Sequence, residues 1–380
     1  MKQLRFRCGV AALASLSVLA IACDRTSSYR IGVVLDADGI RGASFAAQAI
    51  NSAGGIHGHR LELVTMPGAS TTSASVALTA AERVASDPTV LAVVGHTNSS
   101  ASLAASQVYN AKHVTQIAPT TTTPLYSRAG PYSFRLVASD EHQGLFLAKQ
   151  VLRQSPRTRT AVIFVNDDYG RALAAVVIRE LHAAGRAPAY STPYTEHTDG
   201  FQDHAEVVGA LSRARPDLLI WVGRAVDFSQ IALEIRAALP NLSVLASDGF
   251  GGPALSQDSL HTLTGVRYVR LVDYSRPNTA LARLMAQYRN AGFGELTDQA
   301  SLAYDAVLLL AQAMRERGRK RDAIREWVAS VGRSTPPFPG VTGPIAFPTG
   351  GDRAPVYVLA GVPTYTPRES VHARPVSVKR

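Results

Sequence analysis

The 380-residue sequence predicts an α/β protein with two doubly wound lobes, each built on a parallel sheet. Short apolar runs rich in β-branched residues alternate with segments of helical periodicity, a pattern typical of right-handed βαβ units. The alternation occurs in two successive series, each the size of a domain. The composition, with 46% hydrophobic and 18% charged residues, is that of a globular chain. The sequence therefore favours two packed lobes over a disordered chain.

The first series of strands and helices covers residues 29–119. It starts with the apolar run Tyr29–Leu35, which is followed by helical spacing in Gly42–Asn51 and by the glycine pair 54–55 that ends this helix. The later elements are expected as strand 57–66, helix 71–86, strand 90–95, helix 99–112 and strand 113–119.

The second series follows a turn-rich stretch at residues 120–137. Its expected elements are helix 140–155, strand 159–166, helix 169–185, strand 187–195, helix 201–214, strand 216–223, helix 228–239 and strand 242–247. Beyond it the sequence predicts strand 265–272, helices 278–292, 298–317 and 321–330, and a hairpin punctuated by Gly and Pro at 343–361.

Residues 1–22 predict a signal peptide of the lipoprotein type. Three basic residues precede an uncharged apolar run, residues 10–22, that is too short to span a bilayer comfortably. The small residues before Cys23 resemble the bacterial lipobox, in which cleavage leaves the cysteine as a lipid-bearing N-terminus; ordinary cleaved secretion is the alternative. The only other cysteine, Cys8, lies in the segment to be removed, so no disulfide is expected in the mature chain.

The mature chain is expected to be basic. Loss of the three basic residues of the signal peptide leaves 36 basic against 29 acidic residues, a net charge of +7 instead of +10. Basic residues gather at 315–321 and in the tail 363–380, with little aromatic interleaving. Such clusters are typical of a solvated helix end and of a disordered terminus rather than of a nucleic-acid surface. Contact with anionic lipid headgroups stays open.

A polar turn, Gly95–Ser100, connects the expected strand 90–95 to the next helix. Its hydroxyl groups suggest a helix cap, the nucleophile turn of a serine hydrolase, or a site for an anionic ligand. The hydrolase turn requires Gly-x-Ser-x-Gly, and neither its second glycine nor its spacing is present. A helix N-terminus offers unpaired N–H groups and a partial positive charge, so a cap and a carboxylate site both fit. The residues alone leave these two interpretations open.

The sequence offers no metal, cofactor or catalytic site. His57 and His59 are too close together to place both imidazoles easily on one ion, and the other histidines are scattered. Asp167 and Asp168 lack the oxygen-rich loop of a calcium site. No nucleophile with a matching base and no phosphate-binding loop is visible, so we expect neither a cofactor nor catalysis.

Five stretches, taken together and in this order, resemble the type I periplasmic substrate-binding proteins of ABC transporters, near the leucine/isoleucine/valine-binding branch. The resemblance extends from residue 29 to residue 360 and implies two lobes joined by a three-segment hinge, with crossovers near Ser139, Val272 and Phe347. It also implies closure on a ligand in the cleft between the lobes. The stretches that carry it are residues 49–64, 93–126, 165–174, 303–307 and 341–353.

The resemblance also implies the division of the chain into lobes. The first lobe is expected to combine residues 29–139 with 273–346, and the second lobe residues 140–272 with 347–362. The signal peptide, 1–22, precedes them, and the basic tail 363–380 is expected to be disordered.

In the first lobe, the resemblance places ligand contacts on two loops at the carboxyl ends of strands. Ser99 matches the serine that binds the ligand carboxylate, and Thr97 belongs to the same loop. Thr120 is expected to contribute its backbone, and Thr122 its hydroxyl, to the amino and carboxylate groups of the ligand. From the residues alone, the threonine run could equally be a turn of high β-propensity before Pro124.

In the second lobe, Tyr169 matches an aromatic wall over the ligand, and Asp248 matches the acid that pairs with the α-ammonium group. A structural tyrosine and a helix-capping aspartate are the alternatives. Arg224 departs from the pattern because amino-acid binders often carry tyrosine there. It could pair with Asp248 in the empty cleft or meet an acidic group of the ligand. The first loop is also shorter than usual and is expected to bring Asp36, Asp38 and Arg41 towards the mouth of the cleft, which favours a more polar ligand than an unbranched apolar amino acid.

The functional hypothesis is an exported, lipid-anchored solute-binding protein that captures an amino acid or related amide for an ABC permease. The alternatives are a ligand-sensing receptor component of the same fold and an exported enzyme that acts on amides. The expected partners are the small-molecule ligand, the permease and, through the lipid, the cytoplasmic membrane, without nucleic acid.

Overall fold

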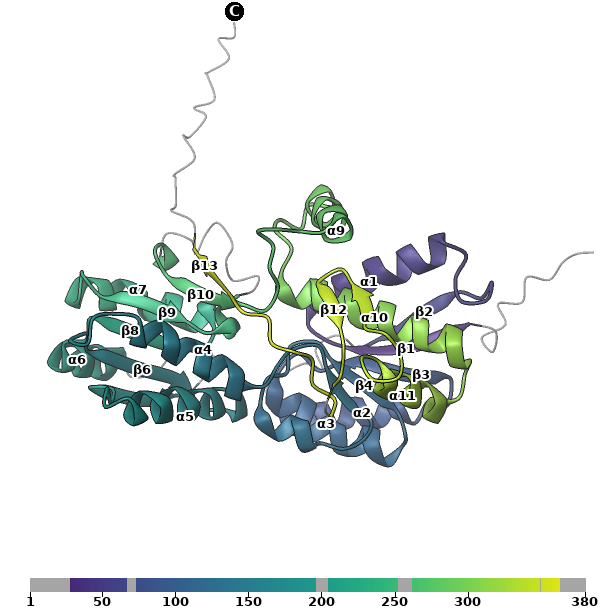
Figure 1. Ribbon diagram of the computed structural model, residues 1–380, viewed down its shortest axis with the longest axis horizontal. Helices are drawn as coiled ribbons and strands as arrows, with labels where there is room; N and C mark the ends of the chain where they lie inside the picture. The colour runs from purple at the N-terminus through teal and green to yellow at the C-terminus, as the bar shows by residue number, and fades with distance from the viewer. Residues whose placement is uncertain (1–27, 67–72, 196–203, 252–261, 349, 363–380) are drawn as a thin grey trace, which may run out of the picture.

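The chain folds into two α/β lobes, as the sequence predicts, and Figure 1 shows them side by side. The computed structural model describes residues 28–66, 73–195, 204–251, 262–348 and 350–362. The expected signal peptide, Cys23 and the expected disordered tail lie outside these residues.

The first lobe contains a five-stranded parallel sheet in the order β2-β1-β3-β4-β5. Its central strand β3 is a continuous apolar run that is buried throughout, because helices cover both faces of the sheet. Its first elements are β1 (Tyr29–Val34), α1 (Ala37–Ser52), β2 (Leu61–Thr65), α2 (Ala74–Ala85), β3 (Val90–Gly95), α3 (Ser99–Ala111), β4 (Thr115–Ala118), the 3₁₀ helix η1 (Pro124–Arg128) and β5 (Ser133–Arg135).

The second lobe contains a six-stranded sheet in the order β13-β10-β9-β8-β6-β7, in which only β13 runs antiparallel to its neighbour. Its other elements lie between the first and second crossovers of the chain. They are α4 (Asp140–Leu152), β6 (Thr160–Val165), α5 (Asp168–Ala183), β7 (Tyr190–Tyr194), α6 (His204–Ala214), β8 (Leu218–Val222), α7 (Ala225–Ala238), β9 (Ser243–Ala246), the 3₁₀ helix η2 (Asp248–Phe250) and β10 (Arg267–Arg270).

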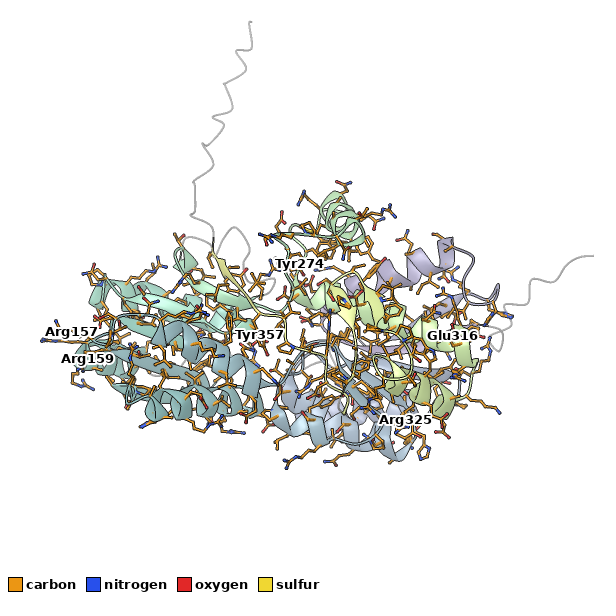
Figure 2. All side chains as sticks on the ribbon, in the orientation of Figure 1. Arg157, Arg159, Tyr274, Glu316, Arg325 and Tyr357 are labelled. Atoms are coloured by element: carbon orange, nitrogen blue, oxygen red, sulfur yellow. The ribbon has the colours of Figure 1, made fainter. Side chains whose placement is uncertain are left out.

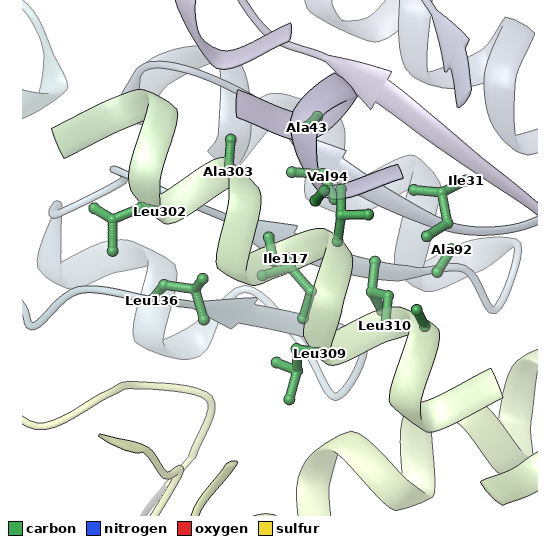
Figure 3. Packing of buried hydrophobic residues seen from close by; sticks show 14 of the residues in the cluster. Ile31, Ala43, Ala92, Val94, Ile117, Leu136, Leu302, Ala303, Leu309 and Leu310 are labelled. Atoms are coloured by element: carbon green, nitrogen blue, oxygen red, sulfur yellow. The ribbon is translucent and has the colours of Figure 1, made fainter. Parts of the chain in front are cut away.

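After β10 the chain returns to the first lobe and completes its core. The returning elements are α9 (Thr279–Asn290), α10 (Asp298–Arg317), α11 (Arg321–Ser330), β11 (Phe338–Gly340) and β12 (Gly343–Ile345). In Figure 3, Leu302, Leu309 and Leu310 of α10 pack among the sheet residues Val94 and Ile117. Helix α10 also packs against α1, where a Cβ atom at Gly42 would lie only 1.9 Å from the carbonyl oxygen of Ala300. Glycine at position 42 therefore lets the two helices approach closely.

The prediction of a hairpin at residues 343–361 is wrong. Its first strand, β12, pairs with β11 in a separate two-stranded sheet, whereas β13 (Val358–Gly361) pairs with β10 of the second lobe. The Gly- and Pro-rich segment between β12 and β13 is a crossover, anchored where Arg135 and Asp352 form a bridge.

The chain thus passes between the lobes three times, after β5, after β10 and after β12. Figure 2 shows Tyr274 and Tyr357 on two of these crossovers, in the region between the lobes. The Tyr357 hydroxyl donates to the carbonyl oxygen of Ser139 at 3.3 Å, and Tyr274 donates to the carbonyl oxygen of Thr297 at 2.8 Å. The single-residue boundaries expected at 139, 272 and 347 stay predictions.

Candidate functional site

A cavity of about 270 Å³ lies between the two lobes. It is formed at the carboxyl ends of strands in both sheets, where ligands of doubly wound folds are expected. The first lobe contributes the lining residues Asp36, Thr97, Asn98, Ser99, Thr120, Asp298 and Gln299. The second lobe contributes Tyr169, Arg224, Ala225, Val226, Asp248, Gly249, Phe250 and Gly251. The remaining lining residue, Leu271, follows β10 at the second crossover.

Six of the seven residues expected to bind the ligand line this cavity, and Thr122 does not. Thr122 is buried behind the wall, where its side chain lies beside the carboxyl group of Asp140. Its backbone carbonyl accepts a hydrogen bond from the Asp140 amide at 2.8 Å. Burial and the charge of Asp248 raise the pKa of Asp140. Thr122 therefore contacts the first crossover rather than the cavity in this conformation.

The interpretation that a hydroxyl group of the turn Gly95–Ser100 caps the helix is wrong, because Asn98 is the N-cap of α3. The Asn98 side chain accepts a hydrogen bond from the amide of Ala101 at 2.9 Å. Ser99 is the first helical residue, and its hydroxyl oxygen accepts a bond from the Thr123 amide at 3.3 Å. A hydroxyl that accepts one bond can still donate another. The side chain of Ser99 is thus placed beside the positive end of a helix, in the cavity wall.

Thr97 joins three loops of the first lobe. Its hydroxyl oxygen accepts bonds from the amide of Asp36 and from the side chain of Gln299, each at 3.0 Å. Its carbonyl oxygen accepts a bond from the Thr120 hydroxyl at 2.8 Å. These bonds hold together the loops after β1, β3 and β4 and the start of α10.

His96, beside this loop, is fully buried. Its protonation makes the free energy of unfolding depend on pH. Burial lowers its pKa to about 3, and its Nε2 lies 3.1 Å from the hydroxyl of Tyr109. Because an exposed histidine has a pKa of about 6.5, the unfolded chain takes up a proton between these values and the folded chain does not. Through this residue, acidification from pH 7 to pH 5 is expected to lower the free energy of unfolding by about 2 kcal/mol.

Urea unfolding at the two pH values measures this effect. His96→Gln should show a smaller loss of stability on acidification than the wild type, whereas His59→Gln, at an exposed position, should match the wild type. Equal pH dependence in all three proteins would contradict the assignment.

In the second lobe, Tyr169 and Asp248 form one hydrogen-bonded unit. The phenol oxygen lies 2.6 Å from Asp248 Oδ1 and 2.7 Å from Ser247 Oγ, and it accepts a bond from the Gly249 amide at 3.1 Å. The Asp248 amide donates to the side chain of Gln143 at 3.1 Å. Asp248 is the first residue of η2 rather than its cap. Burial raises the pKa of its carboxyl group, and the bond from Tyr169 opposes this rise.

Arg224 does not pair with Asp248. Its guanidinium group lies 3.1 Å from Oδ2 of Asp167, the N-cap of α5, so this part of the expectation is wrong. Both groups are carried by loops at the carboxyl ends of neighbouring strands, β8 and β6, which brings them together. Arg224 still lines the cavity.

Only one of the three charged residues expected from the short first loop reaches the cavity. Asp36 caps α1 and lines the wall, as expected. Asp38 is buried and hydrogen-bonded by Tyr288 and Thr297, and Arg41 lies over the ring of Phe293, 4.9 Å from its centre. Asp38 is thus buried away from the mouth, so the expectation for it is wrong, and Arg41 does not line the cavity.

Asp298 and Gln299 are lining residues that the sequence did not reveal. They stand at the start of the long helix α10, which the sequence predicts from residue 298, but only the fold shows that this helix end reaches the cavity. Asp298 pairs with Arg270 at 2.9 Å and accepts a bond from the Leu271 amide at 2.7 Å. Burial raises the pKa of Asp298 and also that of Asp36. The cavity therefore combines several helix N-termini, among them that of α3, with several carboxyl groups.

The model of a family described as periplasmic binding protein matches residues 19–358. The chain belongs to this family. The resemblance inferred from its motifs is therefore confirmed, as is the type I fold with two lobes.

This periplasmic binding protein is similar to known proteins over most of its length. It is 26% identical over 321 residues to the Leu/Ile/Val-binding protein homolog 1 of Brucella abortus, covering 84% of each chain. The leucine binding protein LivK of Thermotoga maritima has the same fold, with a TM-score of 0.79 and 21% identity over 89% of this chain and 96% of that one. A solute binding protein of Rhodopseudomonas palustris, solved with 3,4-dihydroxy benzoic acid, has a TM-score of 0.74 and 16% identity over 88% and 93%.

Two other features are absent from the described part of this periplasmic binding protein. Within it, no three or more His, Cys, Asp or Glu side chains gather in a way that could hold a metal ion. In the same ranges, no helix is both long and apolar enough to cross a membrane.

Proposed function

We propose that this protein captures a small α-amino acid between its lobes and presents it to an ABC permease. One observation carries the proposal: a single cavity has a helix N-terminus with Ser99 on one lobe and the partly buried carboxyl group of Asp248 on the other. The first site suits a carboxylate, because backbone N–H groups and the helix dipole favour an anion. The second suits an ammonium group, because a buried carboxylate is costly unless a cation pairs with it.

The arrangement favours an amino acid over an aromatic acid. A benzoate has a carboxylate but no cation, so it would leave Asp248 without a partner in a closed cleft. An amino acid satisfies both ends at once. Leucine and Leu/Ile/Val binding by the similar proteins supports this class of ligand.

The mechanism would be hinge closure around the three crossovers. The ligand would favour the closed state because it contacts Ser99 on one lobe and Tyr169 and Asp248 on the other. The permease would then recognise the closed protein. We further propose that the chain is exported and anchored through lipid on Cys23.

Replacement of Ser99 tests the carboxylate site. Ser99→Ala is expected to weaken amino-acid binding about tenfold, since it removes one hydrogen bond to a charged group. Ser100→Ala is the matched control, because Ser100 lies on the same helix outside the cavity lining. Isothermal titration of the mature protein with the α-amino acids measures both. Equal affinities for the two variants would refute the role of Ser99.

A further inference from the structure

The first-lobe wall of the cavity contains a cluster of polar residues that is separate from Ser99 and Asp248. It consists of Asp36, Thr97 and Gln299. The Gln299 side chain donates to the Thr97 hydroxyl, and the Asp36 amide donates to the same hydroxyl. These bonds join the loops after β1 and β3 to the start of α10 and fix the backbone of Asp36, whose carboxyl group lies in the wall. A fixed position of this kind is the condition for a selective binding group.

The charges of the cavity do not balance within the protein. Asp298 is paired with Arg270, and Arg224 with Asp167. In the ranges that the structure describes, no basic side chain lies within 4.0 Å of the carboxyl group of Asp36 or of Asp248. Among the residues that the structure describes, two carboxyl groups of the lining therefore lack a cation.

The groups that contact Asp36 are all neutral. Its Oδ1 accepts bonds from the backbone amides of Asp38 and Gly39, at 3.1 and 2.9 Å. Burial nonetheless raises the pKa of Asp36, and the neighbouring Asp38 adds to this rise. Closure of the lobes would remove more water from this carboxylate, at a cost that only a cation fully offsets.

We propose that the ligand is an α-amino acid whose side chain ends in a cationic nitrogen, which binds Asp36. This inference rests on the proposed function, in which Asp248 takes the α-ammonium group and the N-terminus of α3 takes the carboxylate. The lining residues Ala225, Val226 and Leu271 offer apolar contacts for a methylene chain. The volume of about 270 Å³ is small among ligand sites, which suits one amino acid and not a peptide.

Other side chains complement this wall less well. A leucine side chain would leave Asp36 desolvated and unpaired, and a glutamate side chain would bring a second anion next to it. The carboxamide of glutamine can donate a hydrogen bond but carries no charge. A basic amino acid alone supplies two cations for the two unpaired carboxyl groups.

Titration calorimetry with lysine, ornithine, arginine, glutamine and leucine tests the proposal on the mature protein. A basic amino acid should bind at least about tenfold more tightly than leucine or glutamine. Asp36→Asn should weaken the basic ligand about tenfold to a hundredfold and leave leucine unchanged or tighter. Asparagine caps a helix as well as aspartate, so this variant should keep α1. Glu82→Gln, at an exposed position of the same lobe, should match the wild type.

The outcomes separate this inference from the proposed function. Tighter binding of leucine or glutamine than of any basic amino acid overturns the inference and leaves amino-acid binding intact. An equal loss of affinity for every ligand in the Asp36→Asn variant also overturns the inference, since Asp36 would then have only a structural role. Absence of binding to all α-amino acids refutes the proposed function itself.

Discussion

Asp248→Asn is expected to weaken amino-acid binding about a hundredfold. The change keeps the size of the side chain and removes the charge that would pair with the α-ammonium group in a closed cleft. Truncation of a buried charged pair at an interface costs about 2–5 kcal/mol, which corresponds to a factor of roughly 30 to several thousand. Titration calorimetry of the variant and the wild type, with the ligand that the wild type binds best, measures the loss.

Two controls make the result for Asp248 specific. Glu206→Gln removes an acidic charge at an exposed position of the second lobe and should leave the affinity unchanged. Thermal unfolding without ligand should show that Asp248→Asn is folded. A folded variant with the affinity of the wild type would show that Asp248 does not bind the ammonium group.

Arg135→Ala is expected to lower the free energy of unfolding by about 3–5 kcal/mol, because it leaves a partly buried carboxylate and several carbonyl groups without their donor. The Arg135 side chain is fully buried, and it forms a bidentate pair with Asp352 at 2.7 and 2.8 Å. It also donates to the carbonyl oxygen of Thr123 at 2.8 Å. One guanidinium group thus holds the threonine segment at the cavity to the last crossover.

Urea denaturation measures the effect at Arg135. Arg157→Ala, at an exposed position at the far end of the second lobe in Figure 2, should change the free energy of unfolding by less than about 0.5 kcal/mol. A similar small change for Arg135→Ala would show that the pair with Asp352 contributes little.

Much of the fold was predictable because the lobes repeat one local pattern. The continuous apolar run at β3 requires burial on both faces, and helix α10 begins and ends where its periodicity does. The hairpin at 343–361 failed for a physical reason: β13 pairs with β10, about ninety residues earlier, and local spacing contains no information on such pairing. For the same reason, local spacing could not show that Asp298 and Gln299 line the cavity.

The candidate site was predictable to the extent that its residues follow strands. Ser99, Tyr169 and Asp248 all stand just beyond the carboxyl end of a strand, and the structure brings them to one cavity. Side-chain direction was not predictable: Asp36 and Asp38 are two residues apart, yet one caps α1 at the cavity and the other turns inward to Tyr288. The partner of Arg224 depended on the neighbouring loop, which no sequence spacing specifies.

Strand β13 is the last described strand in the sequence, and this order affects how the sheet of the second lobe is completed in the growing chain. Strand β10 is an edge strand of the second sheet until residues 358–361 pair with it, and unpaired edges are templates for aggregation. During synthesis from the N-terminus, all the other described strands of that sheet precede the whole return through the first lobe. Strand β10 therefore stays uncovered until the last described strand is made, and β13 then replaces it as the edge of the sheet. The protection of β10 against self-association is completed only after the return through the first lobe.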